Sequence, residues 1–158
     1  MIVFHTSYIQ VSNPDIHHSR DFLDFGKGFY VTTNKQQQAI NYANRFIRRN
    51  GEAWLNVFEL NDDLSNWNIL SFEEYNETWL DYVYNCRKGL KEESHYDIII
   101  GGVANDKVFR TIDLFFSGEI TKQEALKRLI YEKPNIQYCL RNQQLIDAEL
   151  HYISSERL

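Results

Sequence analysis

The sequence predicts an α+β protein that forms one domain over residues 1–158. Short runs of β-branched and aromatic residues alternate irregularly with longer segments of helical periodicity, without the regular strand–helix–strand repetition of a parallel sheet. The chain contains no linker rich in Pro, Gly or Ser and no internal repeat. At 158 residues it can bury a substantial core without disulfides or metals.

Strands are expected where apolar and β-branched residues run together or alternate over a few positions. In chain order they are residues 2–7, 29–33, 54–60, 96–103, 135–141 and 150–154. The centre of the fourth strand, from Ile98 to Ile100, is continuously apolar and is expected to be buried. Residues 8–24 show no sustained period and are expected to form a loop with a turn at Asn13 and Pro14.

Helices are expected where apolar residues recur every three or four positions. They are residues 35–49, 72–87, 105 or 106 to 116, 121–131 and 143–148. Asn34 can cap the first of these helices, and Gly89 follows the end of the second. Thr121 with Glu124 forms a capping box at the start of the fourth.

Charge and cysteine content narrow the classes of function. The net charge of −5 argues against non-specific binding to a phosphate backbone. Cys86 and Cys139 lie far apart without a partner motif, which is typical of reduced thiols in a cytoplasmic protein. No apolar run approaches the ~20 residues that span a bilayer, and the first residues enter a strand rather than a signal peptide. His17 and His18 point apart because they are adjacent, so no metal site is predicted.

The segment from Asp24 to Tyr30, DFGKGFY, places two glycines around one lysine and between aromatic residues. Two interpretations remain open at this point. Gly26 and Gly28 either permit a turn that needs unusual backbone angles or allow a ligand to approach bare backbone.

Strand alternation indicates which side chains share a face. His5 shares a face with Val3 and Ser7, and Tyr30 shares one with Gly28 and Thr32. Gln137 shares a face with Asn135 and Cys139. Taken singly, His5 is more simply a structural histidine, Tyr30 a core residue and Gln137 a solvated one.

Three segments taken together, VFHTS, DFGKGFY and NIQYCL, resemble the site segments of the ADP-ribosyltransferase superfamily. The branch is the His-Tyr-Glu one of diphtheria toxin and the poly(ADP-ribose) polymerases. The residues from Phe25 to Tyr30 are similar to the polymerases' FGKGIY, and HTS stands where those enzymes have HGS. Nearly the whole chain also resembles a small bacterial family of this superfamily, whose members share DFGKGFY, VAND and QY and often lie beside a small partner gene.

The resemblance implies a fold and an activity. The fold would be a split, mostly antiparallel pair of sheets with flanking helices around an NAD cleft. The activity would be that of an NAD-dependent mono-ADP-ribosyltransferase, a glycosyltransferase that uses NAD as substrate and needs no metal. The protein would be the toxin of a bacterial toxin–antitoxin-like pair, with a small antitoxin protein as partner. The net charge of −5 favours a protein or small-molecule acceptor over bulk nucleic acid.

The resemblance also implies roles for individual residues. His5 would bond the ribose on the adenosine side, and the backbone of Thr6, assisted by Ser7, would pair with the nicotinamide amide. Tyr30 would stack on the nicotinamide ring. Four further residues are expected to bind NAD: Arg20 at the pyrophosphate, and Phe25, Gly26 and Gly28 where the backbone meets the ligand. Tyr42 is either a second stacking aromatic residue or a core residue.

Position 137 departs from the resemblance, because active relatives usually carry glutamate there. A glutamine can bond a ribose hydroxyl but provides no negative charge, and each ~1.4 kcal/mol of lost stabilisation slows a reaction tenfold. The departure leaves an NAD glycohydrolase and a non-catalytic NAD- or ADP-ribose-binding module as alternatives. Glu132 and Glu149 are nearby acids that are more simply surface charges. Asn105 or Asp106 could face the acceptor, although a helix cap is the simpler role.

Overall fold

The structure is a computed structural model that describes residues 1–91, 95–104 and 106–158, with backbone alone for residues 35–41 and 106. It confirms the α+β class: within the described chain, one seven-stranded mixed sheet is accompanied by five α-helices. The order of strands in the sheet is β4-β5-β6-β2-β1-β3-β7. All neighbouring strands are antiparallel except β4 and β5.

Most strands coincide with the predicted ones. They are β1 (Ile2–Ser7), β2 (Phe29–Thr32), β3 (Trp54–Leu60), β4 (Ile69–Ser71), β5 (Ile98–Gly102), β6 (Ile136–Leu140) and β7 (Leu150–Arg157). Strand β4 was not predicted from the sequence; its three residues pair in parallel with the first half of β5. Strand β7 runs three residues beyond its predicted end, because it pairs with β3 as far as Arg157.

The helices are α1 (Lys35–Asn50), α2 (Glu77–Lys88), α3 (Asp106–Phe116), α4 (Lys122–Leu129) and α5 (Gln143–Glu149), with a short 3-10 helix at Ile16–His18 inside the predicted loop. Polar side chains cap the start of three of the α-helices described, namely Asn76 for α2, Thr121 for α4 and Asn142 for α5. The prediction that α2 begins at residue 72 is wrong. The Phe72 amide bonds the Ile100 carbonyl and so extends the pairing with β5, while Asn76 caps the helix through the Trp79 amide.

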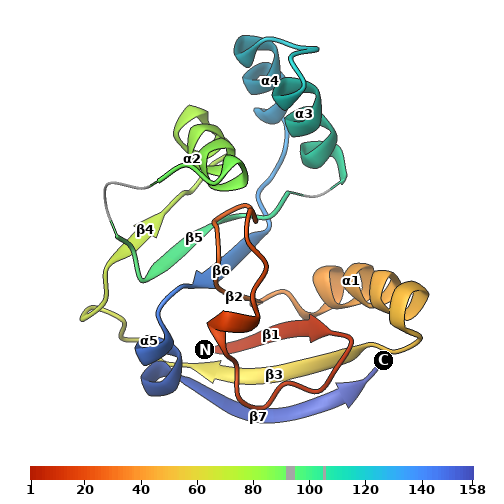
Figure 1. The fold of residues 1–158 in the computed structure, drawn as a ribbon, viewed down its shortest axis with the longest axis vertical. Coiled ribbons are helices and arrows are strands. Elements are labelled where there is room, and N and C mark those ends of the chain that lie inside the picture. The colour runs from red at the N-terminus through yellow and green to blue at the C-terminus, as the bar shows by residue number, and fades with distance from the viewer. Residues whose placement is uncertain (92–94, 105) are drawn as a thin grey trace.

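The sheet consists of two halves joined by a single residue pair. Strands β4, β5, β6 and β2 form one half, and β1, β3 and β7 form the other. Between the halves, the register of β1 and β2 consists of Phe4 opposite Thr32 alone. The family resemblance implied a split pair of sheets; the described chain instead has one continuous sheet, with a single residue pair at this joint. Figure 1 shows the first half in the upper part of the molecule and the second below it.

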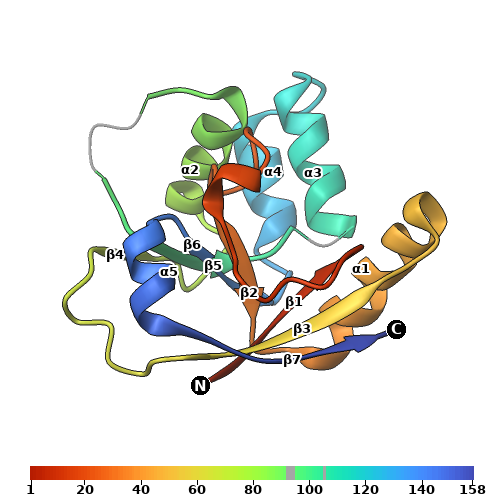
Figure 2. The ribbon, with the colours of Figure 1, turned by 60° about the horizontal axis from the view of Figure 1, so that its bottom comes forward.

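Two hydrophobic clusters cover opposite faces of the first half. One cluster packs α2, α3 and α4 against Ile99 and Cys139, and the other packs α5 against Phe29 and Leu140. Strand alternation accounts for the division, since Tyr30 is paired with Cys139 and Phe29 with Leu140. Figure 2 shows α2, α3 and α4 together on one side of the sheet and α5 on the other.

Candidate functional site

Beyond Phe4, the edge of β1 that faces β2 has no strand partner, and we call this unpaired edge the opening. Met1 and Leu60 exchange both main-chain hydrogen bonds, so the odd-numbered residues of β1 direct their N–H and C=O groups towards β3. The even-numbered Phe4 and Thr6 direct theirs towards β2. Because the pairing of β1 with β2 consists of Phe4 and Thr32 alone, Thr6 presents a donor and an acceptor to the opening. A primary carboxamide is the chemical complement of such a pair.

The His5 side chain links β1 to the main chain of β2. Its Nδ1 lies 2.7 Å from the carbonyl oxygen of Tyr30, and because a carbonyl only accepts, Nδ1 carries the hydrogen. Burial lowers the pKa of His5, although the bond to Tyr30 acts in the opposite direction. The neutral ring therefore keeps Nε2 as an acceptor for a hydroxyl. The ring lies 4.2 Å from that of Phe29, on the face of the sheet opposite the Tyr30 side chain.

Tyr30 and Gln137 share one face of the sheet. Tyr30 is paired with Cys139 and Thr32 with Gln137, so Tyr30 and Gln137 are diagonal neighbours. Gln137 is 7% exposed, and its amide makes no hydrogen bond to another described residue. On its other side it is paired with Gly101, which has no side chain to cover it. The register of β2 and β6 thus brings Tyr30 and Gln137 together, whereas His5 meets them only through the main chain of residue 30.

The Tyr30 hydroxyl holds the turn that precedes β2. It accepts a hydrogen bond from the Phe25 amide at 3.1 Å and donates one to the Gly26 carbonyl at 2.5 Å. Burial raises the pKa of Tyr30 well above its ordinary value, so the hydroxyl keeps the proton that it donates. Burial likewise raises the pKa of Cys139 to about 12, which excludes this thiol as a nucleophile at neutral pH.

The glycines of DFGKGFY serve the fold in two different ways. Gly26 has a φ of +75°, which an L side chain rarely adopts. A Cβ at Gly28 would lie 2.6 Å from the Cys139 Sγ and 2.8 Å from the Leu140 oxygen. Gly28 therefore permits close approach of β6, and its N–H bonds the Ser19 hydroxyl. The Phe25 side chain is fully buried in the core, and its main-chain amide bonds the Tyr30 hydroxyl.

The remaining predicted NAD-binding residues lie around this turn. Arg20 is exposed and follows Ser19, whose hydroxyl accepts from the Gly28 amide. Burial, followed by the charge of Asp24, raises the pKa of Tyr42 on α1, while Arg45, Arg20 and Arg87 lower it. Tyr42 therefore lies within electrostatic reach of charges from three segments of the chain.

Ser7 and Glu149 form hydrogen bonds with other parts of the fold, and Glu132 lies near Tyr75. Ser7 is 8% exposed, and its hydroxyl lies 3.4 Å from the Ile9 amide that donates to it. Glu149 accepts hydrogen bonds from Asn61 and Trp67, which ties it to the other face of the fold. Glu132 is half-buried and lies within electrostatic reach of Tyr75.

The two candidate acceptor residues cannot be placed as side chains. Asn105 lies outside the described residues. Asp106 is the first residue of α3, and its side chain also lies outside the described part.

Sequence reasoning missed an ion pair between Asp24 and Arg87. The Arg87 Nε and Nη2 both donate to the Asp24 Oδ1, at 2.8 and 2.5 Å, and the side chains are 16% and 15% exposed for Arg87 and Asp24. The guanidinium also lies over the Phe109 ring at 4.8 Å. The sequence could have drawn attention to Asp24 only because it directly precedes FGKG. Its partner Arg87, on α2, could not be predicted from the sequence.

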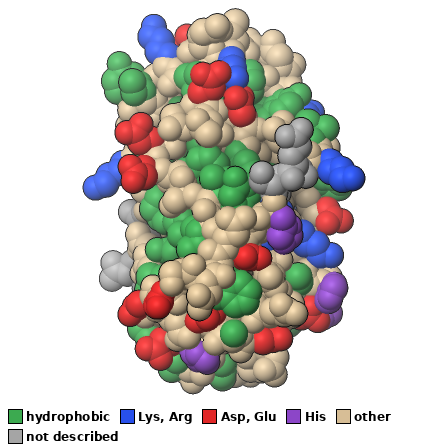
Figure 3. Space-filling view, turned by 90° about the vertical axis from the view of Figure 1, so that its left-hand side faces the viewer, with side chains coloured by type: hydrophobic (Ala, Val, Ile, Leu, Met, Phe, Trp, Pro, Cys, Tyr) green, Lys and Arg blue, Asp and Glu red, His purple; other side chains and the backbone are tan. Residues whose placement is uncertain are grey.

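The face shown in Figure 3 carries no cluster of Lys and Arg side chains among the described residues. There, apolar side chains occupy much of the middle, and Lys and Arg side chains lie mostly towards the margins. Acidic side chains are interspersed among them. This distribution agrees with the net charge of −5.

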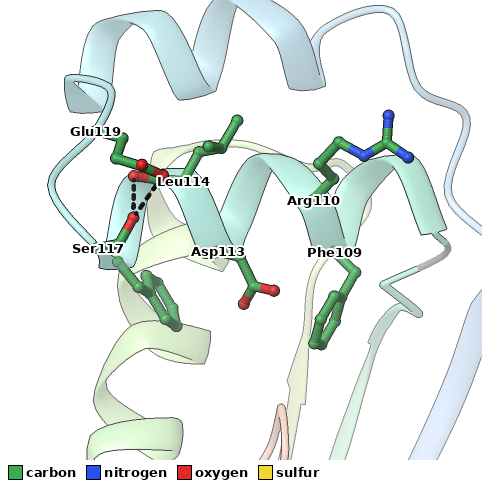
Figure 4. A pocket seen from close by; sticks show the side chains of 7 residues that line it. Phe109, Arg110, Asp113, Leu114, Ser117 and Glu119 are labelled. Carbon is green, nitrogen blue, oxygen red and sulfur yellow. Dashed lines mark hydrogen bonds between the residues drawn. The ribbon is translucent and has the colours of Figure 1, made fainter.

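Two surface cavities lie outside the set of His5, Tyr30 and Gln137. The larger, of about 800 Å³, lies along α3, where Phe109 and Asp113 project to the same side (Figure 4). The smaller, of about 400 Å³, is lined in part by Gly26, Lys27 and Arg141 and so borders the DFGKGFY turn. Neither is lined by the three residues that the sequence singled out as catalytic.

Metal and membrane features were also sought in the part of the chain that the structure describes. There, no three His, Cys, Asp or Glu side chains are grouped so as to hold a metal ion. Within the same residues, no helix is both long enough and apolar enough to cross a bilayer.

Comparison with known proteins gives one positive result. No curated protein and no solved structure matches the chain. A family model described as a protein of unknown function, DUF3990, matches residues 1–152, nearly the whole chain. The protein therefore belongs to the DUF3990 family.

Proposed function

We propose that this protein is an NAD-dependent mono-ADP-ribosyltransferase that cleaves the nicotinamide–ribose bond and transfers ADP-ribose to an acceptor. The observation that carries the proposal is the opening beside the β1–β2 joint. The free main-chain pair of Thr6 adjoins His5 there, while Tyr30 and Gln137 share the adjacent face of the sheet. To these we add Arg20 and Tyr42, a cation and an aromatic ring suited to a dinucleotide, which lie within electrostatic reach of each other.

Each group has a defined task in this proposal. The Thr6 N–H and C=O bind the carboxamide of nicotinamide, and the neutral His5 accepts a ribose hydroxyl at Nε2. Arg20 pairs with the pyrophosphate, and Tyr30 and Tyr42 provide aromatic surface. These contacts bend NAD and hold it in place. In a heterolytic cleavage, such positioning supplies much of the decrease in activation free energy.

The chemistry requires stabilisation of a positive ribose. As the C1′–N bond breaks, its electron pair leaves with nicotinamide, and charge develops on C1′ and the ring oxygen of the ribose. The Gln137 amide can orient a ribose hydroxyl but cannot oppose this charge. We therefore expect slow turnover, or an additional carboxylate in the site.

The biological part of the proposal concerns partners. The net charge of −5 and the marginal position of basic side chains on the face in Figure 3 favour a protein or small-molecule acceptor. We further propose that the protein is the toxic member of a bacterial pair, acts in the cytoplasm and is neutralised by a small antitoxin protein. Induced expression in a bacterial host should then slow growth, and His5→Ala should abolish this effect.

Incubation with NAD labelled in the adenine ring tests the proposal. Label transferred to a protein or small molecule supports it, whereas free ADP-ribose alone would identify a glycohydrolase. Unchanged NAD with measurable binding would identify a binding module, and the absence of binding would reject all three functions.

Variants of Gln137 test its assignment to the site. Gln137→Ala should lower NAD cleavage, because a ribose contact is lost. Gln137→Glu should raise cleavage by about tenfold or more, because it keeps a hydrogen-bonding group and adds negative charge. A folded Gln137→Ala protein with full activity would remove residue 137 from the site.

A further inference from the structure

Arg87 binds only one of the two oxygens of the Asp24 carboxylate. The Arg87 Nε and Nη2 both donate to Oδ1, and no described residue donates a hydrogen bond to Oδ2. The side chain is 15% exposed, so Oδ2 is neither fully solvated nor satisfied by the protein. Among the described side chains, the fully buried polar atom without a partner is Trp79 Nε1, so Asp24 Oδ2 keeps access to solvent and to a ligand.

The same carboxylate adjoins the proposed site. The Tyr30 hydroxyl holds the main chain at Phe25 and Gly26, immediately after Asp24. The charge of Asp24 also contributes to the raised pKa values of both Tyr30 and Tyr42. Asp24 therefore lies within electrostatic reach of the two aromatic residues proposed to surround nicotinamide, one on β2 and one on α1.

Arg87 fixes the orientation of this carboxylate. Its guanidinium is held on α2 and lies over the rings of Phe109, at 4.8 Å, and Phe116, at 5.9 Å. A planar guanidinium with two N–H groups on one oxygen leaves little freedom to the carboxylate plane. Oδ2 is thus held in a set direction before any ligand arrives, which is what an electrostatic catalytic group requires.

We propose that Asp24, through Oδ2, supplies to this site the carboxylate that position 137 lacks. This inference rests on the proposed function. As the C1′–N bond breaks, the electron pair leaves with nicotinamide, and Oδ2 opposes the positive charge on the ribose. The acceptor then forms the new bond to C1′ with its lone pair, and its proton passes to Oδ2 and from there to solvent.

The first experiment compares Asp24→Asn with a matched control, Asp97→Asn. Asp97 is also 15% exposed, and it accepts hydrogen bonds from Asn68 and Asn142. The rate of NAD cleavage and the dissociation constant for NAD are measured for both variants. Asp24→Asn should cleave NAD about tenfold or more slowly with little change in NAD affinity, whereas Asp97→Asn should cleave at the wild-type rate.

A second experiment moves the carboxylate. Gln137→Glu, added to Asp24→Asn, should raise NAD cleavage by a larger factor than the same change does in the wild-type background, because the negative charge then replaces one that is missing. A merely structural role of Asp24 predicts the same factor in both backgrounds. If Asp24→Asn is unstable because Arg87 is left without a charged partner, Arg87→Met in the same protein removes the unpaired charge and keeps the comparison possible.

Three outcomes would overturn the inference. They are wild-type cleavage by Asp24→Asn, parallel loss of NAD affinity and cleavage in Asp24→Asn, and an equal gain from Gln137→Glu in the wild-type and Asp24→Asn backgrounds. A wild-type protein that binds NAD without cleaving it would also overturn the role of Asp24 but leave NAD binding intact. A wild-type protein that does not bind NAD would reject the proposed function itself.

Discussion

The proposed contact of Thr6 with NAD uses its main-chain N–H and C=O, so a proline substitution can test it. The Thr6 N–H faces the opening rather than β3, so a proline there removes a donor that the sheet does not use. We expect Thr6→Pro to stay folded and to lose affinity for NAD by about tenfold, whereas Thr6→Ala, which keeps the N–H, should bind normally. Isothermal titration with NAD and with nicotinamide measures both effects, and equal binding by the two variants would contradict the assignment.

His5 predicts a dependence of stability on pH. Because its pKa is lowered in the folded protein, the unfolded chain binds a proton first as the pH falls below about 6.5. The free energy of unfolding should therefore decrease from that pH down to the folded pKa of His5, by at most about 1.4 kcal/mol per pH unit for this proton. Urea unfolding at several pH values should show a smaller decrease for His5→Asn. The exposed His151→Asn serves as the control, and an unchanged decrease in His5→Asn would refute the prediction.

At the scale of elements, the contact between β2 and β6 depends on the absence of one side chain. Gly28→Ala would place a Cβ 2.6 Å from the Cys139 Sγ and 2.8 Å from the Leu140 oxygen. We expect a loss of about 1–3 kcal/mol in the free energy of unfolding, measured by urea denaturation. Cys139→Ala in the same protein should recover part of this loss, because the sulfur is removed and the carbonyl stays. Gly118→Ala, whose Cβ would meet no atom within 4 Å, measures the cost of a glycine replacement in open space at a positive φ.

Periodicity and capping residues predicted most elements because they are local signals. The start of α2 shows the limit of that method. Phe72 fits the helical period, but its amide bonds the Ile100 carbonyl, and the helix begins only after Asn76. Strand β4 was missed because three residues are too few to show alternation and gain their pairing from β5. The shared face of Tyr30 and Gln137 depends on the register between β2 and β6, which no local pattern contains. Likewise, the bond from Arg87 to Asp24 joins residues that only the folded chain brings together.

At the scale of the whole molecule, the two half-sheets are not two units of the chain. The chain crosses between them four times, after β1, β2, β3 and β6. We therefore expect one cooperative unfolding transition, although a single residue pair joins the halves in the sheet. Single-tryptophan variants that keep either Trp54 on β3 or Trp79 on α2 should report the same urea midpoint. Two separate midpoints would show that each half is stable by itself.

The repeated crossing also has a consequence for the time that folding takes. Strand β1 must find β3, and β2 must find β6, across long stretches of intervening chain, so loop-closure entropy opposes the transition state before many contacts form. Folding should therefore be slow for a protein of this size, on the order of milliseconds to seconds. Because each half is completed by a strand from a distant part of the chain, the opening beside Thr6 and His5 forms late in folding, when β1 and β2 have both joined their partners.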